Sequence, residues 1–479
     1  MRKEKDFIGE KLIPKQALYG IHSLRAKENF SNYTNFHKEW YMALGMVKLA
    51  YYSVYKDFKK AILKNYPQSC IKLFPDKIIS MLIEAAKEVA EGKFFSHFIV
   101  PGIQGGAGTS INMNINEIIT NLALKKLGYP PGNYNIIDPI EHANIYQSTN
   151  DTVPTALKVA AMKLFLELED AINITRQHFE RLEKKYRYDL RIGYTQLQEA
   201  VPTTFGKQFS AYAEALARDW WRVSKCMERL KFVNLGGSAI GTSISVPKYF
   251  VVEIVPRLRQ ITRLPLAQAE NLVEATQNLD AIVEVHAILK SHATNLEKIV
   301  SDIRLQASEF ARQREITIPQ VQVGSSIMPS KINPVIAEFV ISIAHKVYAN
   351  DVLISSLVSQ GQFELNAYIP LIGYALLESL KLLISANKSL SEKMLKNLKI
   401  DTQTAYENLL KSPSIATALN SIIGYHKASL LAKQMRTDKC DIFEANNKLK
   451  ILNPEILKDL LKYDKLLQKG FSVKDLKCE

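Results

Sequence analysis

The stretch VIAEFVISIA, residues 335–344, is apolar on nearly every face of a helix. A helix of this kind has to be covered on all sides, either by a large bundle or by other subunits. It begins a longer run, from Pro334 to about Val358, in which apolar residues recur at three-and-four spacing. The stretch therefore predicts a helix inside a bundle, and it favours an oligomer.

Four other runs share this helical spacing and contain few helix breakers. They extend from Thr155 to about Lys185, from Thr204 to about Phe232, from Leu266 to about Arg312, and from Leu365 to about Leu398. Several exceed the usual helix length of about 11–12 residues, which is typical of bundles. We predict a mainly α protein in three parts: a mixed, mostly helical N-terminal domain (1–146), a central bundle of long helices that oligomerises (147–402) and a small C-terminal helical domain (403–479).

The composition excludes several classes of protein. The chain has 479 residues, of which 47% are hydrophobic and 23% charged, so a packed core is expected and disorder is not. Its four cysteines, Cys70, Cys226, Cys440 and Cys478, form no C-x-x-C pair, which argues against a disulfide framework or a zinc site and fits the cytoplasm. No apolar signal segment begins the chain, and no window approaches the roughly 18–20 consecutive apolar residues of a membrane span.

The net charge of +14 raises the question of a polyanionic partner. The basic residues are spread along helical segments and are not gathered in one block with interleaved aromatic residues. This pattern favours a solvated surface over a nucleic-acid site, so no nucleic-acid partner is expected. A positive field would also attract a small dianion into a cleft.

Two charge-poor stretches come directly before helical runs in the first third of the chain. The first, GGAGTS (105–110), could offer free N–H groups to an anion, but it lacks the lysine of a phosphate-binding loop, and a plain connector explains it equally well. The second, QSTNDTVPT (147–155), crowds more donors at a helix start than capping requires. Such a helix start would accept a carboxylate.

Two further stretches lie later in the chain. TQLQEAVP (195–202) precedes a helical run and by itself indicates a cap and turn. GSSIMPSKINP (324–334) is more specific, because its only charge is Lys331. It supplies a hydroxyl, a cation and an amide, which can hold a carboxylate and take a proton beside it. A G-x-S-x-G elbow is lacking, so a serine hydrolase is disfavoured.

This last stretch resembles the signature Gly-Ser-Ser-x-Met-Pro-x-Lys-x-Asn-Pro of the aspartase/fumarase superfamily and matches it at every fixed position. The other three stretches are similar to the remaining active-site regions of that superfamily, and the resemblance covers nearly the whole chain. Three features resemble the aspartate ammonia-lyases more than the class II fumarases. They are the segment 19–30, Thr149 in place of the second serine of a pair, and Gln196 in place of histidine.

The resemblance implies anti elimination of ammonia from L-aspartate, giving fumarate through an enediolate intermediate. It implies that Ser325, on a mobile loop, takes the Cβ proton as an oxyanion. It also implies a homotetramer with sites between subunits, a small-molecule substrate, no organic cofactor and no catalytic metal. The residues that would bind the carboxylates and the amino group are Thr109, Ser148, Thr149, Asn150, Thr195, Gln196, Lys331 and Asn333.

Two alternatives remain open at this stage. A class II fumarate hydratase acting on L-malate is disfavoured by Gln196. A non-catalytic scaffold or polyanion-binding relative is suggested by the net charge of +14 and by Tyr194, which stands where the family usually has arginine. Phe205, Lys207 and the tail from residue 439 to 479 also depart from the family pattern.

Overall fold

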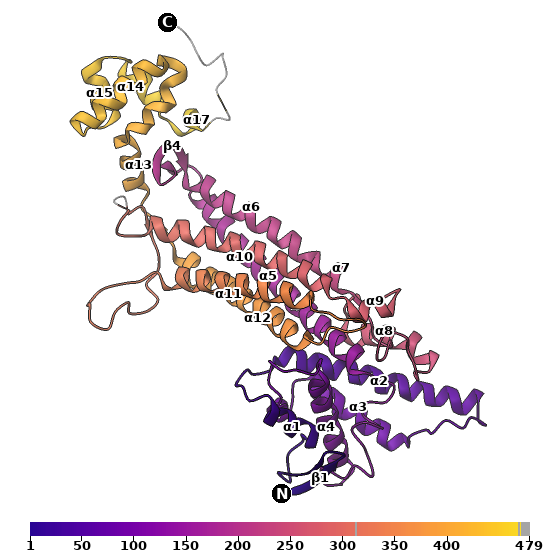
Figure 1. Ribbon diagram of the computed structural model, residues 1–479. Helices are drawn as coiled ribbons and strands as arrows, with labels where there is room; N and C mark the ends of the chain where they lie inside the picture. Colours follow the sequence, from indigo (N-terminus) through magenta and orange to yellow (C-terminus); the bar gives the residue numbers. More distant parts are fainter. Residues whose placement is uncertain (312–313, 468–469, 471–479) are drawn as a thin grey trace. The chain divides into compact units, whose positions relative to one another are not determined.

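The computed structural model describes residues 1–311, 314–467 and 470 (Figure 1). They form two compact units, one of residues 1–169, 221–291 and 345–383, the other of residues 170–220, 292–344 and 384–479. Helices predominate, and the described strands form four two-stranded sheets, so the predicted mainly α class is confirmed. The division into three domains stays a prediction, and Cys478, with residues 471–479 of its last domain, lies outside the described residues.

Five long helices each overlap one of the predicted runs. They are α5 (Thr149–Lys185), α6 (Phe205–Ser224), α10 (Asp280–Gln306), α11 (Val335–Val358) and α12 (Ile369–Ser389). Helix α11 keeps the predicted bounds, and Ala337, Val340 and Val347 are buried. Phe339 and Val352 on the same helix are 40% and 69% exposed, so a single chain covers only part of it.

Two of the predicted runs are wrong in their extent. The run from Thr204 breaks at Lys225, where α6 ends and α7 (Cys226–Leu230) follows. The run from Leu266 contains β6 (Ala267–Gln268), α9 (Leu272–Gln277) and only then α10. The reason is a local cap: the Asn271 side chain accepts the N–H groups of Val273 and Glu274, which starts a short helix inside the apolar pattern.

Helix α12 also has the length and the mean hydropathy of a membrane-spanning segment. Together with the turn that follows it, the segment Ile369–Asn397 is the one described helix that meets this test. Most of its apolar window, 67%, is buried inside the protein. A long apolar helix packed in this way is the core helix of a folded bundle.

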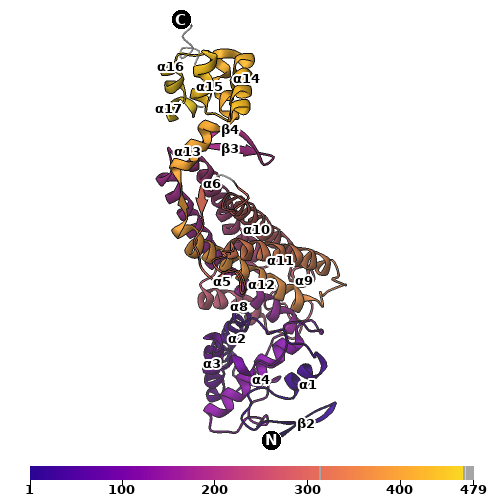
Figure 2. The ribbon, with the colours of Figure 1, turned by 90° about the vertical axis from the view of Figure 1, so that its left-hand side faces the viewer.

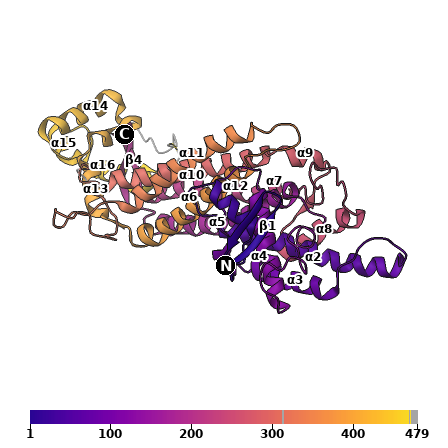
Figure 3. The same ribbon diagram turned by 60° about the horizontal axis from the view of Figure 1, so that its bottom comes forward.

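The first unit contains the N-terminal elements, in which one helix, α2 (Lys38–Asn65), organises the packing. Its neighbours are α3 (Asp76–Ala90) and α8 (Lys248–Thr262), while α4 (Thr109–Lys126) packs on α3 (Figures 1 and 3). Large aromatic side chains fill the interior along α2, and all of them are almost fully buried: Trp40, Tyr41, Tyr51, Tyr52 and Tyr55. Burial of so much aromatic surface fixes this part of the unit.

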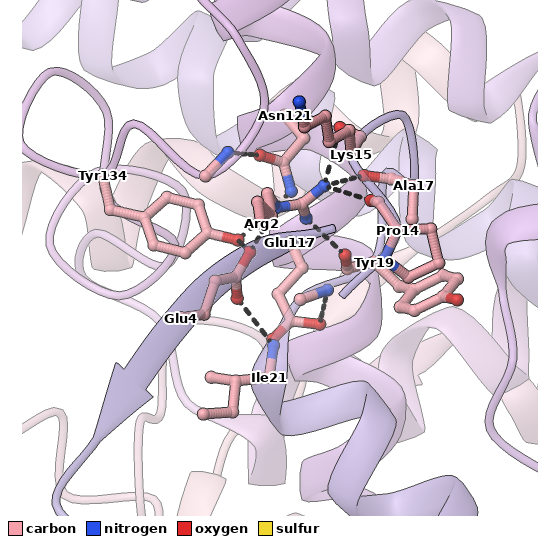
Figure 4. Close-up of polar contacts among 12 residues, drawn as sticks. Arg2, Glu4, Pro14, Lys15, Ala17, Tyr19, Ile21, Glu117, Asn121 and Tyr134 are labelled. Carbon is pink, nitrogen blue, oxygen red and sulfur yellow. Dashed lines mark hydrogen bonds and ion pairs between the residues drawn. The ribbon is translucent and has the colours of Figure 1, made fainter. Parts of the chain in front are cut away.

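The start of α1 (Ile21–Asn29) is held by two buried carboxylates from distant elements, shown in Figure 4. Glu117 of α4 accepts the N–H groups of Gly20 (2.7 Å), His22 (2.9 Å) and Ser23 (3.3 Å). Glu4, on β1 (Arg2–Asp6), accepts the N–H of Ile21 at 2.8 Å. β1 pairs with β2 (Gly9–Ile13), so this hairpin and α4 together provide the cap that α1 lacks locally.

The second unit joins a β-hairpin to the C-terminal helices (Figure 2). β3 (Leu190–Thr195) pairs with β4 (Gln198–Thr204), and the hairpin packs against α13 (Thr402–Lys411). Leu190 and Ile192 share an apolar cluster with residues of the last helices, among them Leu431 and Leu457. Those helices are α14 (Asn420–Asp438), α15 (Ile442–Leu449), α16 (Pro454–Leu460) and α17 (Tyr463–Leu466).

Two short strand pairs complete the described structure. β7 (Ile316–Thr317) pairs with β8 (Lys399–Ile400), close to the beginning of the loop that carries the sequence signature. β5 (Phe232–Val233) pairs with β6 and leads into the residues that follow α7. Both pairs fix the ends of loops that contain candidate site residues.

Candidate active site

The start of α5 presents Ser148, Thr149 and Asn150, three of the predicted binding residues, and all three are half-buried. The Ser148 hydroxyl accepts the N–H of Asn150 at 3.2 Å, and Asp151 accepts the N–H of Ser148 at 3.0 Å. These contacts cap the helix, as the sequence predicted. The Thr149 hydroxyl accepts the side-chain amide of Asn112 at 3.3 Å, so its orientation is also set from α4.

Asp151 is fully buried and fastens this helix start to the rest of the unit. It accepts the hydroxyl of Tyr51 at 3.2 Å and the N–H groups of Gly236 and Ser238 at 3.2 and 3.1 Å. Burial raises the pKa of Asp151 to about 6, although each of these hydrogen bonds lowers it. The Asp151 carboxylate therefore holds the start of α5 in place. The hydroxyls of Ser148 and Thr149 remain the candidates for binding a ligand.

A second ionisable group, Lys48, is buried behind the same helix start. Its ammonium donates to Asn112 Oδ1 and Gln147 Oε1, both at 2.7 Å, and to Asn144 Oδ1 at 3.3 Å. Burial lowers the pKa of Lys48 to about 7, and the charge of Asp151 opposes the shift. The sequence analysis did not select Lys48, because it occurs as a lone polar residue in an apolar helix.

A glycine-rich loop that the sequence analysis also missed lies against Asn150. The Asn150 side chain donates to the carbonyl of Ala239 at 2.7 Å, and Asn234 donates to the carbonyl of Asn150 at 2.9 Å. Pro154 lies inside α5 and has no N–H to give to that carbonyl, so Asn234 replaces the missing helical bond. The signal was available as GGSAIGTS (236–243), a charge-free run of glycine and hydroxyl residues.

Thr109 is exposed at the first position of α4, three residues earlier than the helical pattern indicated. The turn before it has positive φ at Gly106 (82°), Ala107 (54°) and Gly108 (88°). A Cβ on Gly108 would lie 3.0 Å from Val153 of α5. The glycines therefore permit a tight turn before Thr109 and a close approach of Gly108 to Val153 of α5.

The stretch from Thr195 to Pro202 contains the predicted turn, but the turn belongs to a β-hairpin, so the predicted helix cap is wrong. Gln196 and Leu197 form its two-residue turn, both with positive φ (52° and 61°), the geometry of a type I′ turn. Type I′ turns usually contain asparagine and glycine, so a Gln-Leu pair there is strained. The turn exposes Thr195 and Gln196, two predicted binding residues.

The hairpin borders a cavity of about 1070 Å³ in the second unit. Gln196, Tyr194 and Lys207 line it together with Arg191. The buried Arg191 guanidinium lies 5.7 Å from the ring centre of Tyr194 and 5.2 Å from that of Phe205. Three residues of this region depart from the family pattern, and all lie near Arg191. Tyr194 and Phe205 stack on its guanidinium, and Lys207 lines the same cavity.

Ser325, Lys331 and Asn333 lie in the loop between β7 and α11. The Ser325 Oγ accepts the backbone N–H groups of Ile327 (3.2 Å) and Met328 (2.9 Å). Two N–H groups aimed at a hydroxyl oxygen are the arrangement that stabilises an oxyanion. The role that the resemblance implies for Ser325 stays a prediction.

The same loop closes on itself through its glycine. Gly324 donates to the carbonyl of Lys331 at 3.0 Å, and the Asn333 side chain donates to the carbonyl of Gly324 at 2.6 Å. A Cβ on Gly324 would lie only 2.3 Å from the Lys331 carbonyl oxygen, so no other residue fits. The glycine of the signature is thus required by a close backbone approach.

The predicted residues form three groups in the described structure. Thr109 and residues 148–150 belong to the first unit, whereas the pair 195–196 and the loop trio belong to the second. Among the residues that the structure describes, no cluster of three or more His, Cys, Asp or Glu side chains could hold a metal ion. Each group offers hydroxyl, amide or ammonium donors, which suit a dicarboxylate.

Comparison with known proteins gives the class of this protein. The family model described as lyase matches residues 9–349, and the model of the fumarase C C-terminus matches residues 415–468. The crystal structure of a fumarate lyase:delta crystallin from Brucella melitensis is 35% identical over 98% of this chain and 100% of its own, with a TM-score of 0.89. A class II fumarase from Schistosoma mansoni is 26% identical over 98% of this chain and 100% of its own, with a TM-score of 0.87. The chain belongs to the lyase family.

Curated relatives narrow the class further. An aspartate ammonia-lyase from a Bacillus species is 39% identical over 96% of each chain. The aspartate ammonia-lyase of Escherichia coli K12 is 35% identical over 99% of this chain and 98% of its own. The resemblance recognised from the sequence signature is therefore confirmed.

Proposed function

We propose that this chain catalyses the reversible anti elimination of ammonia from L-aspartate to give fumarate. It is an enzyme, a carbon–nitrogen lyase, as its aspartate ammonia-lyase relatives over nearly the full length indicate. The structural observation that carries the proposal is the pair of backbone N–H groups on Ser325 Oγ, in a loop whose one cation is Lys331.

Ser325 acts as the base in this proposal. The Cβ proton of aspartate is only weakly acidic, so its removal needs stabilisation of the enediolate that forms on the β-carboxylate. The Ser325 oxyanion, held by the Ile327 and Met328 N–H groups, takes this proton. The Cα–N bond then breaks, ammonia leaves from the opposite face and the new double bond gives fumarate. The proton returns from Ser325 to solvent or to ammonia.

The other predicted residues bind the substrate. Thr109 and the helix start at 148–150 supply hydroxyl, amide and N–H donors for a carboxylate, and the N-terminus of α5 adds the favourable end of the helix dipole. Thr195 and Gln196 on the hairpin, with Lys331 and Asn333 on the loop, complete the set of donors for the second carboxylate and the amino group. Closure of the loop would exclude water from these contacts.

We also propose a cytoplasmic homotetramer. Support comes from the exposed apolar side chains Phe339 and Val352 on α11, which another subunit would cover. None of the three residue groups is a complete site alone, because the base lies in one and the carboxylate-binding helix start in another, so subunit association can supply the missing groups. Cys70, Cys226 and Cys440 are free thiols, which suits a reducing compartment.

A serine-to-alanine pair tests the assignment of the base. Ser325→Ala removes the oxyanion, and we expect kcat for fumarate formation from L-aspartate to fall by at least about a thousandfold, a loss of the size seen when a catalytic nucleophile or base is removed. Ser330→Ala changes the same loop at a position that the signature leaves variable, and should keep most of the activity. Equal activity of both variants in intact oligomers would show that Ser325 is not the base.

A further inference from the structure

Lys48 is a buried cation without a carboxylate partner. Its side chain has no exposed surface, and in the described part of the chain its hydrogen bonds go to side-chain amides and to no carboxylate. All three ammonium hydrogens go to neutral amide oxygens, those of Asn112, Gln147 and Asn144. Burying a charge in this way is costly, so a merely structural role would be filled more cheaply by an apolar residue.

The partners of Lys48 connect it directly to the helix start that binds substrate. Asn112 accepts from Lys48 through Oδ1 and donates through Nδ2 to the Thr149 hydroxyl (3.3 Å). Gln147 immediately precedes Ser148, and its own amide group is fixed by the carbonyls of Ala143 (3.2 Å) and Ile145 (3.3 Å). The Lys48 ammonium therefore fixes the orientation of two side-chain amides next to the Ser148–Thr149 pair, those of Asn112 and Gln147.

Among the described residues, Lys48 forms no hydrogen bond to the carboxylate of Asp151. Asp151 is the carboxylate that acts on Lys48 electrostatically, and its oxygens already accept from Tyr51 and from three backbone N–H groups. The charge of Asp151 lies at the same helix start and opposes the field of the ammonium there. The effect of Lys48 on the helix start is therefore carried by its hydrogen bonds to Asn112 and Gln147.

We propose that Lys48 is a positioning residue for the substrate carboxylate. It holds Asn112 and Gln147 so that the Thr149 and Ser148 hydroxyls meet the carboxylate. This inference rests on the proposed function, because it assumes that a dicarboxylate binds at the start of α5. Lys48 touches neither the reacting carbon nor the leaving group, so it affects binding of the substrate and of the transition state alike.

Lys48→Met removes the charge and the three donors while keeping the length of the side chain. Loss of an interaction that stabilises the bound substrate and the transition state equally raises KM and leaves kcat nearly unchanged. We expect KM for L-aspartate to rise about tenfold or more, with kcat within about threefold of the wild type, and calorimetry should show fumarate binding weakened by a similar factor.

Lys158→Met is the matched control. Lys158 also lies in the first unit, on α5, and burial lowers its pKa to about 8, but it donates to the carbonyl of Phe232 (2.7 Å) and has no contact with the helix start. The control should keep the wild-type KM even if both variants lose thermal stability. A rise of KM in both variants, or in neither, would overturn the inference.

Asn112→Asp separates positioning from folding. The aspartate can pair with the Lys48 ammonium, but it can donate neither to Thr149 nor to Asn144 Oδ1. The new ion pair offsets part of this loss, so we expect the variant to fold and its KM to rise, and it decides alone if Lys48→Met fails to fold. An unchanged KM in folded Asn112→Asp would contradict the inference. Fumarate formation by the wild-type protein is the separate reference: its absence would overturn the proposed function, whereas its presence with unaltered KM in both variants would overturn only the role of Lys48.

Discussion

Two ionisable side chains behind the start of α5 have opposite pKa shifts from one cause. Burial lowers the pKa of Lys48 to about 7 and raises that of Asp151 to about 6. Each shift disfavours the charged form, and each is opposed by the nearby group of opposite charge or by hydrogen bonds. Both residues therefore change the stability of the protein as the pH changes near neutrality.

The shift of Lys48 predicts that the protein gains stability at alkaline pH. Between pH 7 and 10.5 the unfolded chain, with an ordinary lysine pKa of 10.5, binds more protons than the folded chain, so the unfolding free energy rises with pH. The contribution of Lys48 to this rise is about 2 kcal/mol between pH 7 and 9. Urea unfolding at both pH values should show the rise in the wild type and a rise smaller by about that amount in Lys48→Met. Parallel curves for the two proteins would contradict the shift.

Some candidate site residues could be selected from the sequence because their signal is local. The loop at 324–334 is a contiguous signature, and the contacts of Ser325 and Gly324 are made within it. Lys48 and Asn234 act through partners about 64 to 100 positions away along the chain, and neither stands in an unusual local pattern. Residues of this second kind can be recognised only when the fold brings their partners together.

At the scale of elements, α1 is capped by side chains from two other elements. Its N-cap residue is Gly20, which offers no side-chain cap, and the carboxylates of Glu117 and Glu4 accept all four N–H groups from residue 20 to residue 23. Ser23 also donates its hydroxyl to Glu117. Helix α1 therefore depends on α4 and on the N-terminal hairpin for its position (Figure 4).

Replacement of one carboxylate tests this cap. Glu117→Gln exchanges an accepting oxygen for an NH2 group that faces N–H donors, so we expect the free energy of unfolding to fall by about 1–3 kcal/mol. Glu84→Gln on the exposed side of α3, where the partner Lys126 is 3.6 Å away, should change it by less than about 0.5 kcal/mol. Urea unfolding of both variants decides, and an equal change in the two would show that the cap adds little.

Elements were predicted well where the polar residues of a helix bond to other elements and poorly where a polar side chain caps a new helix. Helix α11 keeps its predicted bounds although it contains Asn350 and Asp351, because Asn350 donates to Glu378 and Asp351 accepts from Lys290. The run from Leu266 failed because Asn271 caps a short helix inside it. The hairpin at β3–β4 was missed because its turn is Gln-Leu, which lacks the asparagine and glycine that usually signal such a turn.

At the scale of the whole molecule, the apolar pattern of residues 335–344 predicts a helix that is buried on all sides, but a single chain buries only part of α11. Phe339 and Val352 on α11 remain exposed, which supports the proposed homotetramer. The net charge of +14 also has a place in this account, because a positive field raises the rate at which a dianionic substrate or product meets the protein. The mainly α class could be predicted from helical periodicity, whereas in the proposed homotetramer the complete sites would also need residues of other subunits, which helical periodicity does not identify.

The substrate, L-aspartate or L-malate, distinguishes an aspartate ammonia-lyase from a fumarase. Purified protein should be incubated with L-aspartate and, separately, with L-malate, while the ultraviolet absorbance of fumarate is followed. Our account predicts fumarate from L-aspartate, with kcat/KM for L-malate lower by at least about a hundredfold, because discrimination between an amino and a hydroxyl group rests on polar contacts at the site. Preferential turnover of L-malate would make the protein a fumarase, and lack of turnover of either compound would contradict the assignment as an ammonia-lyase acting on aspartate.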